Sequence, residues 1–269
     1  MWGFLFKEKN SMETIMQHYR KDEQPFIETV IGWIREVENT YAPKLTDFLD
    51  PRQRYIVESL TNETDLVVGA YGAFPEAERM RVLLFPDYYV PESQDYGVTV
   101  FNVNYASKFV TLGHKDVLGS LMSLGLDRSK FGDIPMADMD VQFAVTAELE
   151  DYVKSNFTAI GKAKVSVSEV TDVEDFIVTH DTWIESLQVV SSMRLDAVVA
   201  ALLNISRQKA VTLVQGEKVR VNWTIQNQPT FELYELDMLS IRGAGRFKVI
   251  TIEGRTRKDR IRLLTGKIE

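Results

Sequence analysis

The stretch SMRLDAVVAALLNISRQKA, residues 192–210, decides the fold of the last part of this chain. Its apolar residues recur at the i, i+3, i+4, i+7 and i+8 positions of one helical face. These residues are Leu195, Val198, Val199, Leu202 and Leu203. Ser206 is expected to cap a second helix, which stops at Gly216 because glycine tolerates the left-handed geometry of a helix end. The stretch therefore predicts two short antiparallel helices, joined at Asn204 and Ile205.

Strands with polar outer faces are predicted to follow these helices. Between Lys218 and Asn222, valines alternate with polar residues, which is the period of a half-buried strand. Two later strands are expected at Arg246–Ile252 and Asp259–Lys267. Two helices with adjoining strands would form one compact C-terminal module.

Positive charge is concentrated in this module. The whole chain has 31 Lys plus Arg and 39 Asp plus Glu, a net charge of −8. Residues 191–269 hold 14 basic and 8 acidic residues, a net of +6, so the preceding residues hold 17 and 31, a net of −14. The densest part is Arg242–Arg262, with eight basic residues. A phosphate-binding face can therefore exist on a protein whose total charge is negative.

We predict that the module binds RNA through basic and polar side chains on its helices, strands and turns. Arginine suits phosphate because its guanidinium donates forked hydrogen bonds. The run Gly243-Ala244-Gly245 allows close approach of the backbone to a phosphate. The alternative interpretation is a solvated charged surface. The candidate RNA-binding residues are Arg194, Ser206, Arg207, Lys209, Lys218, Arg220, Asn222, Arg242, Arg246, Lys248, Arg255, Arg257 and Lys258.

The chain is expected to be a multidomain α+β protein with four segments. Its N-terminal domain is predicted to be mostly helical, because Ser11–Leu60 has a helical pattern, with a short strand at Asp65–Tyr71. A mixed α+β domain and then a linker that ends in packed structure would precede the module. The predicted divisions are 1–75 for the helical domain, 76–175 for the central domain, 176–190 for the linker and 191–269 for the module.

The central domain is predicted to be ferredoxin-like or RRM-like. From residue 98 onward its elements follow the order strand, helix, strand, strand, helix, strand, which is typical of that fold. A further strand at Arg81–Phe85 precedes them. The expected strands are Val98–Asn104, Gly132–Ile134, Val141–Ala144 and Lys164–Val170, and the expected helices are Lys115–Leu124 and Ala147–Phe157.

Several motifs give the chain a resemblance to a known family. Four of them resemble the S-four RNA-binding domain of ribosomal protein S-four: Ser192-Met193-Arg194-Leu195-Asp196, Ser206-Arg207-Gln208-Lys209-Ala210, Val219-Arg220-Val221-Asn222 and Asp237-Met238-Leu239-Ser240-Ile241-Arg242-Gly243. Others are similar to the bacterial YlmH family: Lys108-Phe109, His114-Lys115-Asp116-Val117-Leu118-Gly119, Phe131-Gly132-Asp133-Ile134, Gly243-Ala244-Gly245-Arg246-Phe247 and Gly254-Arg255-Thr256-Arg257-Lys258-Asp259-Arg260. The resemblance implies an RNA-binding protein of the large ribosomal subunit, linked to ribosome-associated quality control of stalled nascent chains. Ribosomal RNA is the implied partner, and tRNA is a further candidate.

A second RNA contact is predicted in the central domain. Its candidate residues are Lys108, His114, Lys115, Arg128 and Lys130. His114 precedes an acidic residue at an expected helix start, so a simple helix cap or a surface residue is the alternative interpretation.

Other classes of chemistry lack a matching pattern. The chain has no cysteine, and His18, His114 and His180 are scattered, so we expect no metal site and no cofactor. The longest apolar run, Ala197–Leu203, is far shorter than the ~20 residues that span a bilayer, so we expect no membrane contact. The absence of cysteine permits a reducing compartment, and we expect a cytoplasmic protein. The alternation of Trp2, Phe4 and Phe6 favours an edge strand over a base-stacking surface.

Two other functions stay open beside non-catalytic RNA binding. One is an RNA-modifying enzyme with its site in the central domain, where Asp116, Asp133, Asp138 and Asp140 are available. The other is a protein-interaction adaptor whose RNA binding is secondary. Pseudouridine synthases also carry a catalytic Asp in an Arg-Leu-Asp motif, but their S-four domain precedes a large catalytic domain. Here only the module follows Asp196, so a helix cap or a bond within the module is expected for this residue.

Overall fold

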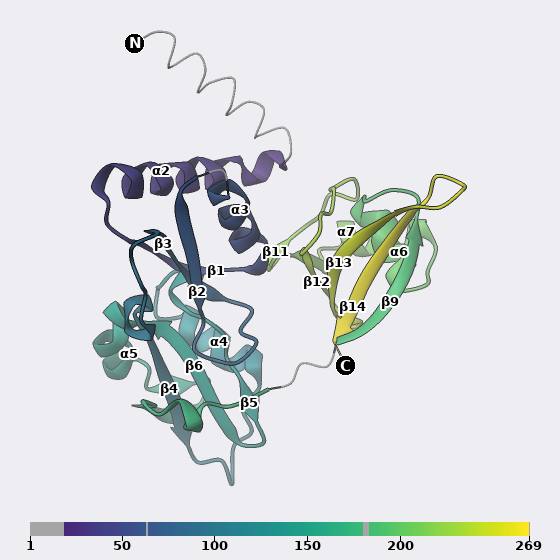
Figure 1. Cartoon of the computed structure of the whole chain (residues 1–269). Coiled ribbons are helices and arrows are strands. Elements are labelled where there is room, and N and C mark those ends of the chain that lie inside the picture. Colours follow the sequence, from purple (N-terminus) through teal and green to yellow (C-terminus); the bar gives the residue numbers. More distant parts are fainter. Residues whose placement is uncertain (1–18, 63, 180–182, 269) are drawn as a thin grey trace. The chain divides into compact units, whose positions relative to one another are not determined.

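The computed structural model describes residues 19–62, 64–179 and 183–268. The chain divides after His180 into two compact units, which we call the N-terminal unit and the C-terminal module (Figure 1). The Trp2, Phe4 and Phe6 alternation, His18 and His180 lie outside the described residues. The fold is mixed helix and sheet, as the sequence predicts, with separate sheets in the two units.

The N-terminal unit begins with helices packed on a three-stranded sheet. After the short 3-10 turn Lys21–Glu23, α2 (Gln24–Thr40) and α3 (Pro51–Thr61) cover the antiparallel sheet β1-β3-β2 (Figure 1). The strands are β1 (Lys44–Leu49), β2 (Leu66–Tyr71) and β3 (Met80–Pro86). Asp50 caps α3 by accepting a hydrogen bond from the Gln53 amide at 2.8 Å, and Pro51 occupies the first helical position, where its missing amide hydrogen costs nothing.

The expectation of a helical pattern throughout Ser11–Leu60 is wrong at β1. α2 ends at Thr40, the next residue Tyr41 has a φ of 53°, and Pro43 then prevents an immediate continuation of the helix. The Thr46 hydroxyl accepts the Val82 amide of β3 at 3.0 Å. Pairing with a strand distant in sequence therefore overrides the local helical pattern. Because β3 pairs with both β1 and β2, the predicted boundary between residues 75 and 76 passes through one sheet.

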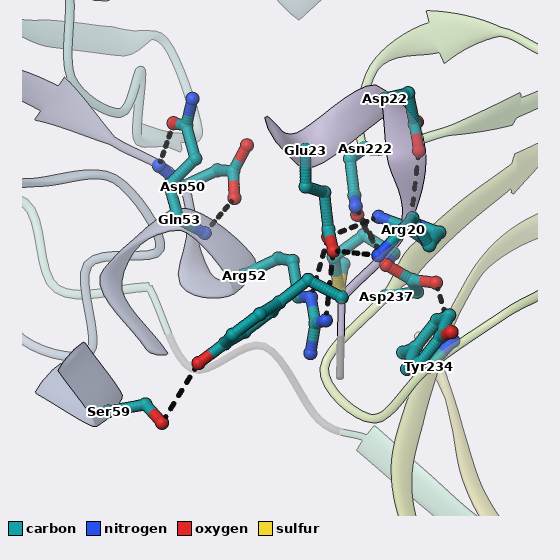
Figure 2. A network of polar contacts seen from close by, with 12 residues as sticks. Arg20, Asp22, Glu23, Asp50, Arg52, Gln53, Ser59, Asn222, Tyr234 and Asp237 are labelled. Carbon is teal, nitrogen blue, oxygen red and sulfur yellow. Dashed lines mark hydrogen bonds and ion pairs between the residues drawn. The ribbon is translucent and has the colours of Figure 1, made fainter. Parts of the chain in front are cut away.

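Buried charged residues hold the start of this unit together. Glu23 Oε1 accepts hydrogen bonds from Arg52 Nε at 2.8 Å and from Arg20 Nη2 at 2.7 Å (Figure 2). Burial opposes ionisation of the carboxyl, but these two arginines hold the pKa of Glu23 below its usual range. The network joins the segment before α2 to α3.

The second layer of the N-terminal unit has the strand order expected of a ferredoxin-like domain. Its five-stranded sheet has the antiparallel order β5-β6-β4-β8-β7, so the main strands run second, third, first and fourth. Gly132–Ile134 is not a strand, because only isolated bonds such as Gly132 N to Ala144 O, 2.9 Å, link it to β6. The elements are β4 (Val98–Tyr105), α4 (His114–Met122), β5 (Met136–Ala137), β6 (Asp140–Thr146), α5 (Glu150–Asn156), β7 (Ala159–Ile160) and β8 (Ala163–Glu169), with 3-10 turns at Ser93–Tyr96, Arg128–Lys130, Ala147–Leu149 and Val173–Asp175.

Two arginines, one in β3 and one just before it, connect the two layers. Arg79 Nη2 donates to the Phe48 carbonyl at 2.8 Å, and Arg81 Nη1 donates to the Gly97 carbonyl at 2.7 Å. Asp133, after the turn at 128–130, accepts the Glu78 amide at 2.6 Å. These bonds satisfy the carbonyl of Phe48 in β1 and that of Gly97 just before β4, so the two layers form one packed unit.

The C-terminal module is a six-stranded antiparallel sheet with two helices on one face (Figure 1). The strand order is β11-β10-β12-β13-β14-β9. Apolar residues of α6 and α7, including Leu195, Val198 and Val214, pack with Val219, Phe247 and other strand residues in one core. The elements are β9 (Trp183–Val190), α6 (Leu195–Leu202), α7 (Arg207–Gln215), β10 (Val219–Val221), β11 (Thr224–Ile225), β12 (Met238–Ile241), β13 (Gly245–Arg255) and β14 (Ile261–Ile268).

The predicted linker at 176–190 is corrected in its second half, which forms β9. This strand pairs with β14 along its whole length, from Trp183 opposite Ile268 to Val190 opposite Ile261. Four consecutive residues among its eight are exposed, so β9 lacks the alternation of buried and exposed residues that indicates a half-buried strand. β9 therefore belongs to the sheet of the module.

No single helix in the described part of the chain is long and apolar enough to cross a membrane. Only when α6 and α7 are taken together are they long and apolar enough for a membrane span, and this pair is bent by 114°.

Candidate nucleic-acid interface

A buried carboxylate holds two arginines at the corner between α6 and α7. Asp196 lies in the first turn of α6 and is only 2% exposed. Arg194 donates to it in forked geometry, with Nε 3.2 Å from Oδ1 and Nη2 2.9 Å from Oδ2. Arg207, the first residue of α7, donates from Nη2 to Oδ1 at 3.1 Å. We call these three residues the Asp196 clamp.

The clamp keeps its arginines accessible. The side chains of Arg194 and Arg207 are 40% and 50% exposed, whereas that of Asp196 is 3% exposed. Burial alone would raise the pKa of Asp196, but hydrogen bonds from the two arginines hold it below its usual range. One buried negative charge thus orients two partly exposed guanidinium groups, and their remaining donors can bind an anion such as a phosphate.

The start of α7 follows the sequence prediction. Ser206 is the N-cap, and its Oγ accepts the Lys209 amide at 3.3 Å. Arg207 and Lys209 are exposed in the first turn. The structure therefore gives Ser206 a capping role and brings two of the predicted cations to the same helix end.

Asn222, which the sequence predicts to contact RNA, forms hydrogen bonds within the module. Its Nδ2 donates to Asp237 Oδ1 at 2.8 Å, and its Oδ1 accepts the Met238 amide at 2.9 Å (Figure 2). The other carboxylate oxygen of Asp237 accepts the Tyr234 amide at 2.8 Å. Both polar atoms of Asn222 thus connect β10 to the start of β12, and we leave this residue out of the proposed RNA contact.

The sheet divides the remaining predicted cations between different surfaces. Val219 and Val221 lie in the core under the helices, so Arg220 between them points to the opposite face. The same alternation in β13 places Arg246 and Lys248 on that opposite face. The structure therefore separates these three cations from the Asp196 clamp.

Two other groups lie at the ends of strands. Lys218 and Arg242 are exposed neighbours, joined by a bond from the Arg242 amide to the Lys218 carbonyl at 2.9 Å. The expected glycine turn follows, with positive φ at Gly243 and Gly245. At the tip of the β13–β14 hairpin the predicted cations Arg255, Arg257 and Lys258 are exposed, together with Arg260.

The predicted second contact in the central domain is only partly brought together. Lys108, His114 and Lys115 are exposed before and within the first turn of α4. Lys115 also lines a groove of ≈ 550 Å³ between α4 and the β7–β8 turn. These residues stay candidates for RNA contact.

Arg128 and Lys130 are engaged elsewhere, which corrects their place in that contact. Arg128 donates to the carbonyls of Phe131 and Gly132, and burial lowers its pKa to about 10. Lys130 Nζ pairs with Asp47 Oδ1 at 2.7 Å, which joins the 128–130 turn to β1. Both side chains stabilise the N-terminal unit.

A two-helix corner with exposed arginines, packed on a basic sheet, defines a protein of the S-four RNA-binding class. A model of the S4 domain matches residues 193–235, which include both helices and the whole Asp196 clamp. Two further models, described as "YlmH, N-terminal" and "Putative RNA-binding domain in YlmH", match residues 22–89 and 91–174. The chain therefore belongs to the YlmH family.

Two relatives agree with this assignment. A Bacillus subtilis (strain 168) protein named "Ribosome-associated protein quality control protein P2" is 45% identical over 253 residues, which cover 94% of this chain and 98% of the relative. A solved structure, "Cell division protein ylmH from Streptococcus pneumoniae", is 32% identical with a TM-score of 0.53 and covers 60% of this chain and 98% of that chain.

Proposed function

We propose that this protein is a non-catalytic RNA-binding protein whose Asp196 clamp binds the backbone of structured ribosomal RNA on the large subunit. The observation that carries the proposal is the pair of half-exposed arginines fixed on one buried carboxylate. The name of the Bacillus relative supports a role in ribosome-associated quality control of stalled translation. We propose tRNA as a further partner.

The clamp favours recognition of backbone shape. Arg194 directly precedes α6 and Arg207 begins α7, so together they can neutralise phosphates that are neighbours in space without reading base edges. Because Asp196 already orients both side chains, less side-chain freedom is lost when the RNA binds. The exposed cations Lys209, Lys218 and Arg242 would add phosphate contacts around the clamp.

Three of the five carboxylates considered for catalysis have structural partners. Asp196 is held by two arginines, and Asp116 Oδ2 accepts the Gly113 amide at 3.0 Å. Asp133 accepts two backbone amides, from Glu78 and Arg79. Since these carboxylates serve structure, we favour binding over catalysis. Mass analysis of RNA incubated with the protein would detect a modification and contradict this choice.

We also propose three functional parts in place of the four predicted segments. The family models match 22–89, 91–174 and 193–235, and β9 belongs to the sheet of the module. A boundary near residue 90 keeps β1, β2 and β3 in one part, which the predicted boundary at 75 does not.

Cosedimentation with large ribosomal subunits in sucrose gradients tests the proposed function. The change Arg194→Glu with Arg207→Glu should abolish comigration at moderate salt and flatten the salt dependence by about one slope unit for each phosphate that the clamp no longer neutralises. A control chain with Lys21→Glu and Arg35→Glu carries the same charge change at exposed positions of the N-terminal unit. Equal losses in the two chains would show that net charge, and not the clamp, controls binding.

A protein-interaction adaptor is the second candidate, favoured by the acidic residues before the module. Affinity purification after nuclease treatment separates the two functions, because an adaptor keeps its protein partner when RNA is removed. Retention of a partner together with failure of the gradient assay would replace our proposal.

A further inference from the structure

One face of the sheet in the C-terminal module carries a cluster of cations around an indole ring. Side chains of a strand alternate between the two faces of a sheet. Phe247 and Val249 of β13 lie in the core under α6 and α7, so Arg246 and Lys248 point to the opposite side. We call this side the outer face.

Trp183 of β9 lies within reach of both cations. Lys248 Nζ is 4.5 Å from the centroid of the indole ring, and Arg246 Cζ is 5.9 Å from it. Cations lie over aromatic rings because the ring faces are electron-rich. Among the described residues, the Lys248 ammonium forms no ion pair, and its contact is with this indole ring.

A glycine makes room for this arrangement. β14 lies between β13 and β9, and its Gly266 is opposite Lys248 of β13 on one side and Glu185 of β9 on the other. A Cβ at position 266 would lie 2.9 Å from Lys248 Cε and 3.1 Å from Trp183 Cε3. Without a side chain at this position, Lys248 can cross β14 and reach the indole.

The cations continue across the sheet. Arg220 of β10 pairs with Ser240, which pairs with Arg246 of β13, so the three side chains form one row on the outer face. The neighbouring row contains Lys248, Gly266 and Glu185. The two rows together thus hold three cations, Arg220, Arg246 and Lys248, and one acidic residue, Glu185. The charge of the surface therefore complements an anionic partner.

Apolar area lies beside the cations. Leu187 and Val189 follow Trp183 at alternate positions of β9 and are 46% and 44% exposed. An aromatic ring next to apolar and cationic side chains suits an unpaired nucleotide, which presents a flat base and a charged phosphate. A duplex would offer its phosphates but no free base face.

We propose that the outer face is a second RNA-binding surface that takes unpaired nucleotides. A base stacks on Trp183, and the adjoining phosphates bind Lys248, Arg246 and Arg220. Lys248 moves from the indole to a phosphate when RNA arrives, which opens the ring face for stacking. The inference rests on the proposed function and extends it, because the clamp then holds structured backbone while the outer face holds a single strand.

Fluorescence of Trp183 provides a direct test in the full chain. The changes Trp2→Phe, Trp33→Phe and Trp223→Phe leave Trp183 as the sole tryptophan. Oligouridylate should quench its emission in a saturable manner, and a blunt RNA duplex of the same length should not. If the triple variant unfolds early, the difference between the native chain and its Trp183→Phe variant supplies the same signal.

Two lysines of this sheet form a matched pair of variants. Lys248→Gln should weaken oligouridylate binding about tenfold, the size expected when one stacking or phosphate interaction is removed. Lys267→Gln is the control, because Lys267 also contacts an aromatic ring, with Nζ 5.9 Å from the centroid of the core residue Phe247. Equal effects of the two variants, or an unchanged Trp183 emission with oligouridylate, would overturn the proposal. Quenching by an acidic peptide and not by RNA would also overturn it and indicate a protein partner.

The clamp variant separates this inference from the proposed function. With Arg194→Glu and Arg207→Glu, binding of large subunits should be lost while oligouridylate still quenches Trp183. If the clamp variant keeps normal subunit binding and Trp183 still responds, the proposed role of the clamp fails and the outer face stands. If subunit binding depends on the clamp and Trp183 does not respond, only the outer face fails.

Discussion

Arg207 and Asp196 connect the two helices of the C-terminal module, with Arg207 Nη2 3.1 Å from Asp196 Oδ1. The carboxylate is buried and the guanidinium is half exposed, so the bond fixes a solvent-facing arginine to the interior of the fold. Arg194 shares the same carboxylate. Loss of the charge at Asp196 should therefore affect two arginines at once.

Asp196→Asn should lower both stability and RNA affinity. The amide keeps one acceptor and loses the charge that both arginines pair with, so we expect a loss of about 1.5–3 kcal/mol in the unfolding free energy, as for hydrogen bonds to charged groups. Urea unfolding and binding to large subunits measure the two effects. Arg207→Lys should retain the positive charge but lose the forked hydrogen-bond donors of the guanidinium group. Stability close to that of the native chain together with weaker RNA binding would support the proposed role of the clamp. Unchanged binding in both variants would contradict it.

The clamp also predicts an acid dependence. Because the pKa of Asp196 is lowered in the folded module, the unfolded chain binds more protons at low pH. The stabilisation is present above the unfolded pKa of about 3.9 and is lost as the pH falls through the folded value. Unfolding measured between pH 5 and pH 2.5 should show a steeper acid loss for the native chain than for Asp196→Asn, and parallel curves would exclude this contribution.

Asn222→Ala tests the structural assignment of this residue. The change removes two hydrogen bonds, one accepted by the Asp237 carboxylate and one donated by the Met238 amide. Removing the partner of a buried hydrogen-bonding group costs about 1–3 kcal/mol, so the thermal midpoint of the module should fall clearly. RNA affinity of the folded protein, measured well below that midpoint, should stay unchanged. Weaker binding with an unchanged midpoint would return Asn222 to the RNA contact.

The sequence predicts the parts of this site that depend on local pattern. The alternation Val219-Arg220-Val221 places Arg220 outward, and Ser206 caps α7 as expected. Arg194 and Arg207 both bind Asp196, and this shared contact depends on the 114° bend between α6 and α7. No residue spacing in the sequence specifies that bend. Helix caps and strand periods are short-range properties, whereas this bend is set by core packing.

Non-local pairing explains what the sequence did not predict. β9 is exposed along much of its length and gains its place from hydrogen bonds to β14, about 80 residues later. β1 likewise depends on β3, and the contact of Lys248 with Trp183 depends on Gly266 between them. Long-range partners therefore decide the edge strand and the outer face, and patterning within one segment does not reveal them.

Asp133 should make the stability of the N-terminal unit depend on pH in the opposite sense to Asp196. Burial is the main cause that raises the pKa of Asp133 from 3.8 to about 6. Between these values the folded state binds more protons, so stability should fall as the pH rises from 4 to 6, by up to the order of 3 kcal/mol. Asp133→Asn should remove this slope, whatever its effect on absolute stability. Identical slopes in the two chains would contradict the raised pKa.

Gly132→Ala should destabilise the joint between the two layers of the N-terminal unit. A Cβ at position 132 would lie 2.7 Å from Phe48 Cε1 and 2.9 Å from Ala144 Cβ. Phe48 is fully buried, so its ring cannot move aside without disturbing the core, and overpacking of this kind costs about 1–3 kcal/mol. Gly119→Ala is the matched control, since a Cβ there meets no atom within 4 Å and alanine favours the helix α4 by about 1 kcal/mol over glycine. Urea unfolding should therefore shift in opposite directions for the two variants. A shift to higher stability in both would show that the two layers are not in close contact at Gly132.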